Sequence, residues 1–314
     1  VRIRRVAWRS FRLPFAGAFV TARGAVTARE GVVVRLVADD GLEGLGEASP
    51  VTAFGGGTAR DVMRLLAELA SGLVGLEASE VEALLSRLAS QEPGVAAARC
   101  ALDTALCDLR ARHAGVPVAM LLGGDATRVV PVNAVVGARA TEAAVATARS
   151  AVDRGFRCVK LKVGVEESLE AEVERVDAVR EAIGPTVKLR LDANGAWSVG
   201  AAVEVLRRLE PYGIELVEQP VAAQDLAGMA RVRRETDIPI AADEAVAGVD
   251  RARRVVEAGA ADVLVVKPMV AGGPRPAAEI VALARAAGLT AFVTSTVDAG
   301  VGVAAALHVA TVLP

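Results

Sequence analysis

The sequence predicts an α/β protein built as a modified (β/α)7β TIM-type barrel with an N-terminal α+β capping domain. From residue 129 onward, short runs of Val, Ile and Leu alternate with helical segments rich in Ala, Arg and Glu. Strands that are apolar on both faces and separated by helices indicate a parallel sheet. The repeat is about 25 residues long and occurs seven times, and this regularity favours a barrel over an open sheet.

Local patterns place the elements of the barrel. Its strands are expected at residues 130–136, 157–163, 187–192, 214–218, 238–242, 262–267 and 290–294. The helices between them include 141–153, 168–183 and 199–210. Because no Gly/Ser-rich or Pro-rich linker precedes this region, we expect the barrel, at 126–314, to pack tightly against the first domain.

The first domain, at 1–125, has a different texture. Residues 1–12 and 31–39 have strand character, and Asp40-Gly41 supplies a hairpin turn into another short strand. Helical periodicity then follows at residues 58–71, 77–90 and 94–113. Gly115-Val116-Pro117 ends the last helix, as Gly and Pro after a helix should.

Composition narrows the class of protein. The 314 residues are 53% hydrophobic and carry a formal net charge of −2, with Arg and Glu mixed along the chain, so nothing resembles the basic stripe that nucleic-acid binding requires. Three cysteines without metal-binding spacing, two of them expected in a helix core, fit a reducing cytoplasm. The N-terminus lacks the apolar stretch of a signal peptide, and glycines interrupt the weakly charged run at 286–314, which predicts a buried strand and helix and no membrane anchor.

Charged side chains occur at successive predicted strand ends. Functional residues of a barrel lie at these ends, where the βα loops converge. From Lys162 to the last residue of the set the steps are 30, 26, 25 and 24 residues, each one βα unit, so all these side chains are expected to point into the same mouth. The set consists of Lys160, Lys162, Asp192, Glu218, Asp243 and Lys267.

Three converging carboxylates repel one another unless a cation lies among them. Oxygen-only ligation favours a hard ion, which predicts Mg²⁺, with Mn²⁺ as an alternative, on Asp192, Glu218 and Asp243. Lysines beside such an ion should have lowered pKa values and could act as bases near pH 7. Removing a proton α to a carboxylate creates an enediolate, which the metal and the ammonium groups would stabilise. We therefore expect a small carboxylate as substrate.

Each of these residues also has an ordinary interpretation. A KxK pair such as Lys160 and Lys162 is usually solvated surface, Asp192 could open a turn, and Asp243 could cap the next helix. Occurrence in register at consecutive strand ends argues against all of these interpretations together. A barrel that has lost catalysis and only binds a ligand is the non-enzyme alternative, and the intact set of carboxylates and lysines argues against it.

The combined motif resembles the muconate-lactonizing subgroup of the enolase superfamily. The matching segments are Lys160-Leu161-Lys162, Asp192-Ala193-Asn194-Gly195, Glu218-Gln219-Pro220, Asp243-Glu244, Lys267-Pro268 and Ala105-Leu106-Cys107-Asp108-Leu109. The resemblance covers nearly the whole chain. It implies a capping domain over a (β/α)7β barrel, Mg²⁺ on the three carboxylates, Lys162 as base on one face of the substrate, and Lys267 as acid, base or electrostatic partner on the other.

Within the subgroup, the N-terminal loops are most similar to o-succinylbenzoate synthases, on Phe19-Val20-Thr21-Ala22-Arg23-Gly24, Arg29-Glu30-Gly31, Gly46-Glu47-Ala48-Ser49-Pro50 and Phe54-Gly55. This resemblance implies a lyase of menaquinone biosynthesis that dehydrates a cyclohexadiene carboxylate. Thr21 and Arg23 would close over the substrate, with Asn194 in the motif and Ser295 and Thr296 lining the far side.

The alternatives are N-acylamino acid racemisation or dipeptide epimerisation, which use both lysines as a symmetric pair, and muconate-type cycloisomerisation. A DxD sequence beyond the last strand is expected for dipeptide epimerases, and only Asp298 is found there. The chain stops at residue 314, before the tail that the resemblance implies, so either that tail is absent from the sequence or the barrel closes differently. Association into homo-oligomers is left open.

Overall fold

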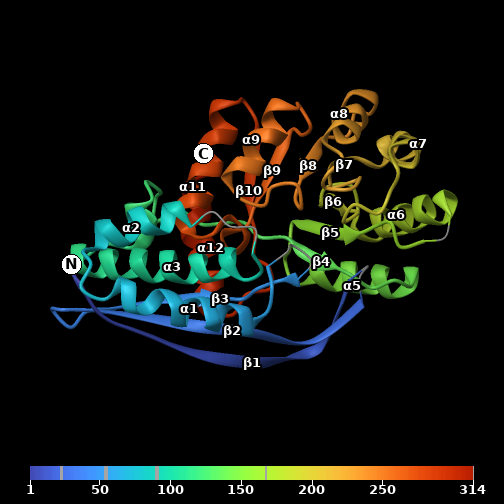
Figure 1. The fold of residues 1–314 in the computed structure, drawn as a ribbon. Helices are drawn as coiled ribbons and strands as arrows, with labels where there is room; N and C mark the ends of the chain where they lie inside the picture. Colours follow the sequence, from blue (N-terminus) through green and yellow to red (C-terminus); the bar gives the residue numbers. More distant parts are fainter. Residues whose placement is uncertain (22–23, 53–55, 89–91, 167, 314) are drawn as a thin grey trace.

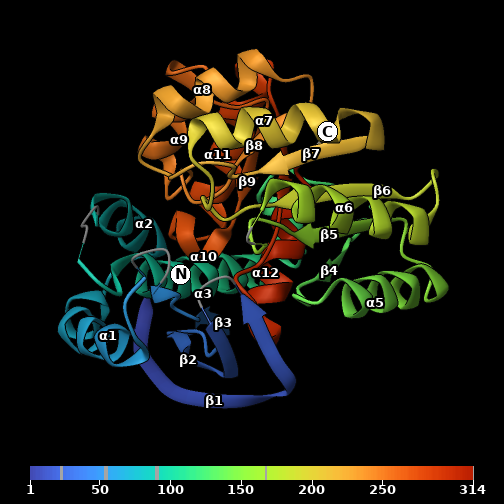
Figure 2. The ribbon, with the colours of Figure 1, turned by 90° about the vertical axis from the view of Figure 1, so that its right-hand side faces the viewer.

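The computed structural model describes residues 1–21, 24–52, 56–88, 92–166 and 168–313, with side chains outside 16–26. It consists of a three-stranded antiparallel sheet with its helices and a curled seven-stranded parallel sheet surrounded by helices (Figure 1). The first sheet lies along one side of the molecule, and helix α3 lies between it and the rest of the chain (Figures 1 and 2). No helix in the described ranges is long and apolar enough to cross a membrane.

The capping domain is a long hairpin extended by a third strand. Strand β1 (Ile3–Thr21) pairs with β2 (Gly24–Ala38), which pairs in turn with β3 (Glu43–Ala48). Strands β1 and β2 extend beyond the predicted 1–12 and 31–39 because their pairing continues to Thr21 and Gly24. The sequence pattern missed this extension because the distal half of the hairpin lacks the Val- and Leu-rich texture of 31–39.

Helices α1 (Ala59–Leu73) and α3 (Val95–Ala114) pack on the first sheet, and α2 (Ala78–Arg87) packs against α3. A capping box starts α1, in which Thr58 Oγ1 accepts from the amide of Asp61 and the Asp61 carboxylate accepts from the amide of Thr58. Strand β3 approaches α3 closely through Gly44 and Gly46, where an added Cβ would lie 2.0 and 1.8 Å from helix carbonyl oxygens. The predicted buried cysteines, Cys100 and Cys107, both lie in α3.

The second sheet has the order β10-β9-β8-β7-β6-β5-β4, with every neighbouring pair parallel, so each strand lies beside its sequence neighbour. This arrangement confirms the predicted α/β class, as a curled half-barrel under an antiparallel capping sheet. Within the described residues β4 and β10 are its two edges. The strands are β4 (Ala134–Val136), β5 (Cys158–Lys162), β6 (Lys188–Asp192), β7 (Ile214–Glu218), β8 (Ile240–Ala242), β9 (Val263–Val266) and β10 (Thr290–Val293).

Helices follow the strands and cover the outer face of the half-barrel (Figure 2). Side chains at the N-caps begin several of them: Ser168, Ser198 and Asp225 each accept a hydrogen bond from an amide in the first turn. The helices are α4 (Val118–Leu121), α5 (Thr141–Asp153), α6 (Leu169–Ile183), α7 (Val199–Leu209), α8 (Leu226–Glu235), α9 (Val249–Glu257), α10 (Pro268–Ala271), α11 (Pro274–Ala286) and α12 (Gly300–Ala310), with a 3-10 turn at Glu210–Tyr212.

The largest apolar core lies between these helices and the parallel strands, and a second fills the capping domain. The two domains also contact each other through charged groups. Asp103 of α3 is fully buried and accepts hydrogen bonds from the amide and Nε of Arg275, at the start of α11, at 3.0 and 2.6 Å. The cap is thereby attached to the barrel helix next to the carboxyl end of β9.

Candidate active site

Five adjacent strands of the half-barrel each bring one charged side chain to the same edge of the sheet. Lys162 and Asp192 are partners in the β5–β6 register, and Asp192 and Glu218 are partners in the β6–β7 register. Asp243 directly follows β8, and Lys267 directly follows β9. Across the sheet the order is therefore lysine, aspartate, glutamate, aspartate, lysine, as the spacing in the sequence predicts.

Lys160 lies two residues before Lys162 on the same face of β5 and connects two of the carboxylates. Its Nζ is 2.9 Å from both carboxylate oxygens of Glu218 and 2.9 Å from Oδ2 of Asp192. The Lys160 side chain is 11% exposed, and the two carboxylates are almost completely buried. In such surroundings these charges interact far more strongly than surface ion pairs do.

Lys162 contacts two groups from the end of β6. Its Nζ lies 2.5 Å from Oδ2 of Asp192 and donates to Oδ1 of Asn194 at 2.8 Å. Asn194 has a left-handed backbone with φ of 47°, and its side-chain Nδ2 donates to Oε1 of Glu244 at 3.0 Å. Asn194 thus connects the lysine on β5 to an acidic side chain that follows β8.

On the other side of the mouth, Lys267 binds both carboxylate oxygens of Asp243. Gln219 holds the backbone around Asp243, because its Oε1 accepts from the amides of Asp243 and Ala245 at 3.1 Å each. The Gln219 side chain is fully buried, and its φ is 40°. The sequence pattern alone does not identify Gln219 and Glu244 as functional residues. For Gln219, the available signal is a polar residue between the strand-end Glu218 and Pro220.

The carboxylates and lysines strongly influence one another's protonation. Burial opposes ionisation of Asp192, but the ammonium groups of Lys160 and Lys162 outweigh it and hold its pKa below the usual range. Burial raises the pKa of Glu218 to about 8, with Lys160 opposing the rise. Burial alone would lower the pKa of Lys160, but Glu218 and Asp192 outweigh it and raise that pKa.

The raised pKa of Lys160 reflects the chain's own charges, whereas the predicted fall concerns a lysine beside a bound cation and stays a prediction. The nearest charges that the chain itself supplies to Lys160 are carboxylates, which stabilise its ammonium form.

The donor set fits a hard divalent cation. Its atoms are all carboxylate oxygens, and the position between Asp192 and Glu218 already holds a positive group, the Lys160 ammonium. In the described parts of the chain, no three His, Cys, Asp or Glu side chains form a ready-made metal cage. We attribute this to the pairing of each carboxylate with a lysine, with which an incoming cation would have to compete.

The capping domain contributes a second buried charged cluster, next to the loop after β10. Glu47 of β3 accepts hydrogen bonds from the amides of Ala299 and Gly302, at 2.7 and 2.8 Å, and so caps the start of α12. Asp298, with a side chain only 2% exposed, accepts from the Thr296 hydroxyl and lies 3.9 Å from Arg29 of β2. Burial raises the pKa of Asp298 to about 6.

This cluster affects the candidates for substrate binding. Thr296 is buried and engaged with Asp298, whereas Ser295 beside it is half-buried. Thr21 ends β1, with only its backbone described, and Arg23 lies outside the described residues. Asn194 is the candidate that directly contacts a predicted catalytic lysine.

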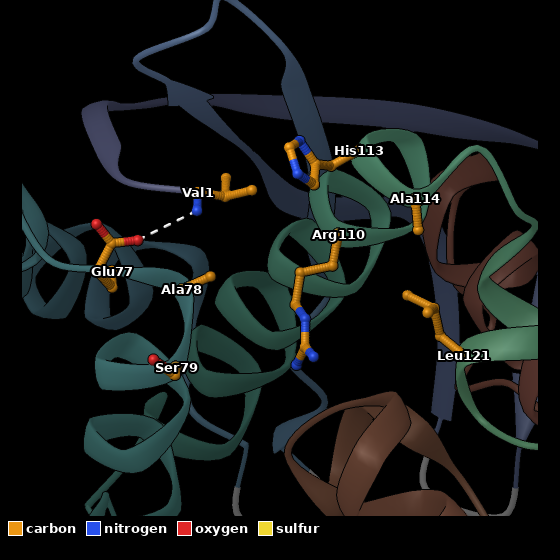
Figure 3. A pocket seen from close by; sticks show the side chains of 8 residues that line it. All are labelled: Val1, Glu77, Ala78, Ser79, Arg110, His113, Ala114 and Leu121. Carbon is orange, nitrogen blue, oxygen red and sulfur yellow. Dashed lines mark hydrogen bonds and ion pairs between the residues drawn. The ribbon is translucent and has the colours of Figure 1, made fainter.

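A surface hollow of about 370 Å³ lies elsewhere, on the capping domain, at the N-terminus and the ends of α2 and α3 (Figure 3). Its lining includes Val1, whose amino group is paired with Glu77, together with Arg110 and His113. None of the strand-end lysines or carboxylates lines it. The charged mouth of the half-barrel is therefore the better candidate for chemistry.

Comparisons with known proteins agree with this geometry. Residues 2–123 match the family model "Mandelate racemase / muconate lactonizing enzyme, N-terminal domain", and residues 143–314 match "Enolase C-terminal domain-like". The L-Ala-D/L-Glu epimerase of Bacillus subtilis is 34% identical over 99% of this chain and 85% of its own length. Its substrate-liganded structure superposes with a TM-score of 0.94, covering 99% of this chain and 87% of that one.

Two further relatives have different reactions in their names. The N-succinyl-L-Arg/Lys racemase of Bacillus cereus is 30% identical over 96% of this chain and 82% of its own length. The o-succinylbenzoate synthase of Thermobifida fusca is 44% identical, but over only 59% of this chain and 56% of that protein. With both family models matched and the strand-end residues in place, the chain belongs to the enolase superfamily, as an enzyme with racemase- and muconate-lactonizing-type domains.

Proposed function

We propose that this protein is a metal-dependent isomerase that inverts the carbon α to a carboxylate in an N-acylated amino acid or a dipeptide. The observation that carries the proposal is the symmetric order of side chains across five adjacent strands. Lys162 and Lys267 flank three carboxylates, and each lysine is paired with the aspartate next to it. A sheet that curls brings its flanking strands to opposite sides of the mouth, so a substrate between them would meet one lysine on each face.

The roles of the chain's own residues follow from this arrangement. Asp192, Glu218 and Asp243 would hold Mg²⁺, with Mn²⁺ as an alternative, and the ion would supply positive charge to the substrate carboxylate as an enediolate develops. Lys162, as the neutral amine, takes the α-proton from one face, and Lys267, as the ammonium, delivers a proton to the other. The reverse direction exchanges their roles. Lys160 stays an ammonium, because Glu218 and Asp192 stabilise that form.

Named relatives support this choice of reaction. Proteins similar to this chain over nearly its whole length include dipeptide epimerases and an N-succinyl amino acid racemase. A dipeptide epimerase from Cytophaga hutchinsonii, whose structure was solved with Mg and D-Ala-L-Val, superposes with a TM-score of 0.93 at 31% identity, covering 99% of this chain and 84% of that one. We extend both the ion and the substrate class to this chain as a proposal.

Dehydration to o-succinylbenzoate is the second candidate, on the 44% identity to the Thermobifida fusca synthase. In that reaction Lys162 would remove the α-proton and return it to the departing hydroxyl on the same face, giving an alkene and water. Lys267 would remain an ammonium over the enediolate. In both reactions Asn194 would orient Lys162, and Thr21, Arg23, Ser295 and Thr296 are the proposed substrate contacts.

The deciding experiment is incubation in D₂O with Mg²⁺, followed by NMR. L-Ala-L-Glu, L-Ala-D-Glu and both enantiomers of N-succinylarginine are tested beside the cyclohexadiene precursor of o-succinylbenzoate. We expect deuterium at the α-carbon and inversion of at least one pair. Lys162→Ala and Lys267→Ala should each lower inversion by at least about 10²-fold, whereas Lys188→Ala, an exposed lysine at the opposite end of β6, should not. Elimination without inversion would instead support the synthase, and full inversion by Lys162→Ala would refute both.

A further inference from the structure

We infer that Arg175 and Glu172, a buried pair on α6, are positioning residues for Lys162. The kinetic part of this inference rests on the proposed function. Among the described contacts, neither side chain binds a charged side chain of the mouth. Both instead hold the backbone that carries Lys162 and the loop that follows it.

Arg175 holds two strand ends together. Its NH1 donates to the carbonyl oxygen of Lys162 at 2.6 Å, and its NH2 donates to the carbonyl oxygen of Ala138, after β4. The guanidinium thus joins the carboxyl ends of β4 and β5 from behind the sheet. The Arg175 side chain is completely buried, and burial lowers its pKa from the usual value.

Glu172, one helical turn earlier, holds the loop after Lys162. Its Oε2 accepts from three successive amides, those of Gly164, Val165 and Glu166, at 2.8, 3.1 and 3.4 Å. Gly164 itself packs against the loop that carries Asn194, because an added Cβ would lie 2.6 Å from Cβ of Ala196. Glu172 therefore also supports, through Gly164, the loop that carries Asn194, one of the groups that contact the Lys162 amine.

Simple stabilisation of the core does not account for this pair. Apolar side chains of similar volume are often at least as stabilising as a buried ion pair. Among the described residues, Nε of Arg175 and Oε1 of Glu172 are buried without a hydrogen bond, which adds a cost, although Nε lies 3.6 Å from Oε1 of Glu166 and Oε1 of Glu172 lies 3.7 Å from NH1 of Arg175. Instead, the hydrogen bonds of the pair fix the position of one stretch of backbone, from residue 162 to residue 166.

The backbone of the opposite lysine is held in a different way. The carbonyl oxygen of Lys267 accepts from the amides of Val270 and Ala271, at 3.0 and 2.8 Å, so the backbone of α10 fixes it. Loss of Arg175 should therefore affect Lys162 and leave Lys267 in place. Where one lysine serves each enantiomer, this predicts unequal loss of α-proton exchange from the two enantiomers, whereas inversion slows equally in both directions because the equilibrium constant is unchanged.

The chain offers a matched control on the same helix. Arg180 also donates to backbone carbonyl groups, those of Tyr212, Gly184, Val187 and Gly213, but it does so at the opposite end of the half-barrel from the lysines. Arg180→Met removes a second arginine of α6 whose side chain is hydrogen-bonded to backbone carbonyl groups. Any general loosening of the helix should appear in both variants.

The test measures α-deuterium uptake separately from each enantiomer in Arg175→Met, Arg175→Lys and Arg180→Met. The enantiomer whose exchange Lys162→Ala abolishes identifies the Lys162 side. In Arg175→Met, kcat for exchange from that enantiomer should fall about 10–100-fold, because a misplacement of about 1 Å has that effect. Its KM, and the rate of exchange from the enantiomer that Lys267 serves, should stay within about 3-fold of wild type. Arg175→Lys should recover part of the loss. Arg180→Met should affect both sides alike, and Arg175→Met with Glu172→Gln serves if the single variant does not fold.

A second measurement needs no substrate. Hydrogen exchange followed by mass spectrometry should show faster exchange of the amides at 164–166 in Arg175→Met than in Arg180→Met. If wild type exchanges neither enantiomer of any substrate tested, the proposed function fails, and this comparison alone decides the positioning role. Equal loss of α-deuterium uptake from both enantiomers, or unchanged amide exchange at 164–166, would overturn the inference.

Discussion

Lys160→Met is expected to destabilise the protein in a way that Mg²⁺ reverses. The substitution keeps most of the side-chain volume and removes the ammonium group between Asp192 and Glu218. Asp192 retains Lys162 at 2.5 Å, whereas the hydrogen bonds of the Glu218 carboxylate are both to Lys160 within the described residues. The variant therefore leaves Glu218 buried without its close cation.

The contacts set the size of the effect. At 2.9 Å and an effective dielectric constant of about 20, each of the two attractions is worth about 6 kcal/mol, and desolvation of the lysine offsets much of the sum. Removing one partner of a buried ion pair typically costs about 3–5 kcal/mol. We expect the lower end of that range near pH 7, because Lys160 opposes the rise in the pKa of Glu218, and without it Glu218 can take up a proton and relieve the repulsion.

Urea unfolding followed by tryptophan fluorescence, with EDTA or with Mg²⁺, measures both effects. In EDTA the variant should lose about 3 kcal/mol of unfolding free energy, and Mg²⁺ should restore more stability to the variant than it adds to wild type, because no ammonium competes for the carboxylates. Lys188→Met, whose exposed amine pairs with Glu215, should cost less than about 1 kcal/mol. A Lys160→Met variant that matches wild type in EDTA, with an identical response to Mg²⁺, would refute the reasoning.

Two further predictions concern the contacts between cap and barrel. Burial raises the pKa of Asp298 from 3.8 to about 6, so the native state binds this proton more tightly and loses stability as pH rises from about 4 through 6. Relative to Asp298→Asn, wild type should lose roughly 3 kcal/mol of unfolding free energy between pH 4 and pH 7, measured by urea unfolding. A difference between the two proteins that stays constant with pH would contradict this. Asp103→Ala should cost about 3 kcal/mol, because the guanidinium of Arg275 loses its buried partner and keeps only the partly exposed Glu82. Adding Arg275→Met should recover part of this loss, which a double-mutant cycle measures; additive losses would show that the pair does not couple.

The sequence was sufficient to predict the central line of the site. Parallel strands in sequential order place their carboxyl ends at one edge, so a spacing of about one βα unit between charged residues translates directly into neighbouring positions. Lys162, Asp192 and Glu218 are in direct register, as that reasoning requires. The curled parallel sheet itself followed from the alternation of apolar strands with helices.

The supporting contacts could not be predicted in the same way. Arg175 lies in the middle of a helix whose pattern gives no reason to bury a guanidinium, and its partners come from two different strands. Glu47 and Asp298 meet across the domain boundary, separated by most of the chain. Such contacts depend on how the cap is placed on the barrel, which periodicity along the sequence does not encode.

The position of Asp298 bears on the choice of substrate. In the sequence it was the one acidic residue near the last strand, and the lack of a second counted against the dipeptide epimerases. Its carboxylate faces Thr296 and Arg29 and is 2% exposed, so it belongs to the contact between cap and barrel. Asp298 is therefore already engaged by the chain's own residues and is not a free partner for the ammonium group of a dipeptide.

The choice between the two proposed reactions then depends on the lysines themselves. Dehydration needs one base, and the second lysine would serve only as a fixed positive charge. The structure instead places the two lysines alike, each at a strand end and each bound to the aspartate at the end of the neighbouring strand. A pair constructed in this near-mirror fashion suits a reaction in which both lysines take and give protons, which is why we place racemisation or epimerisation ahead of elimination.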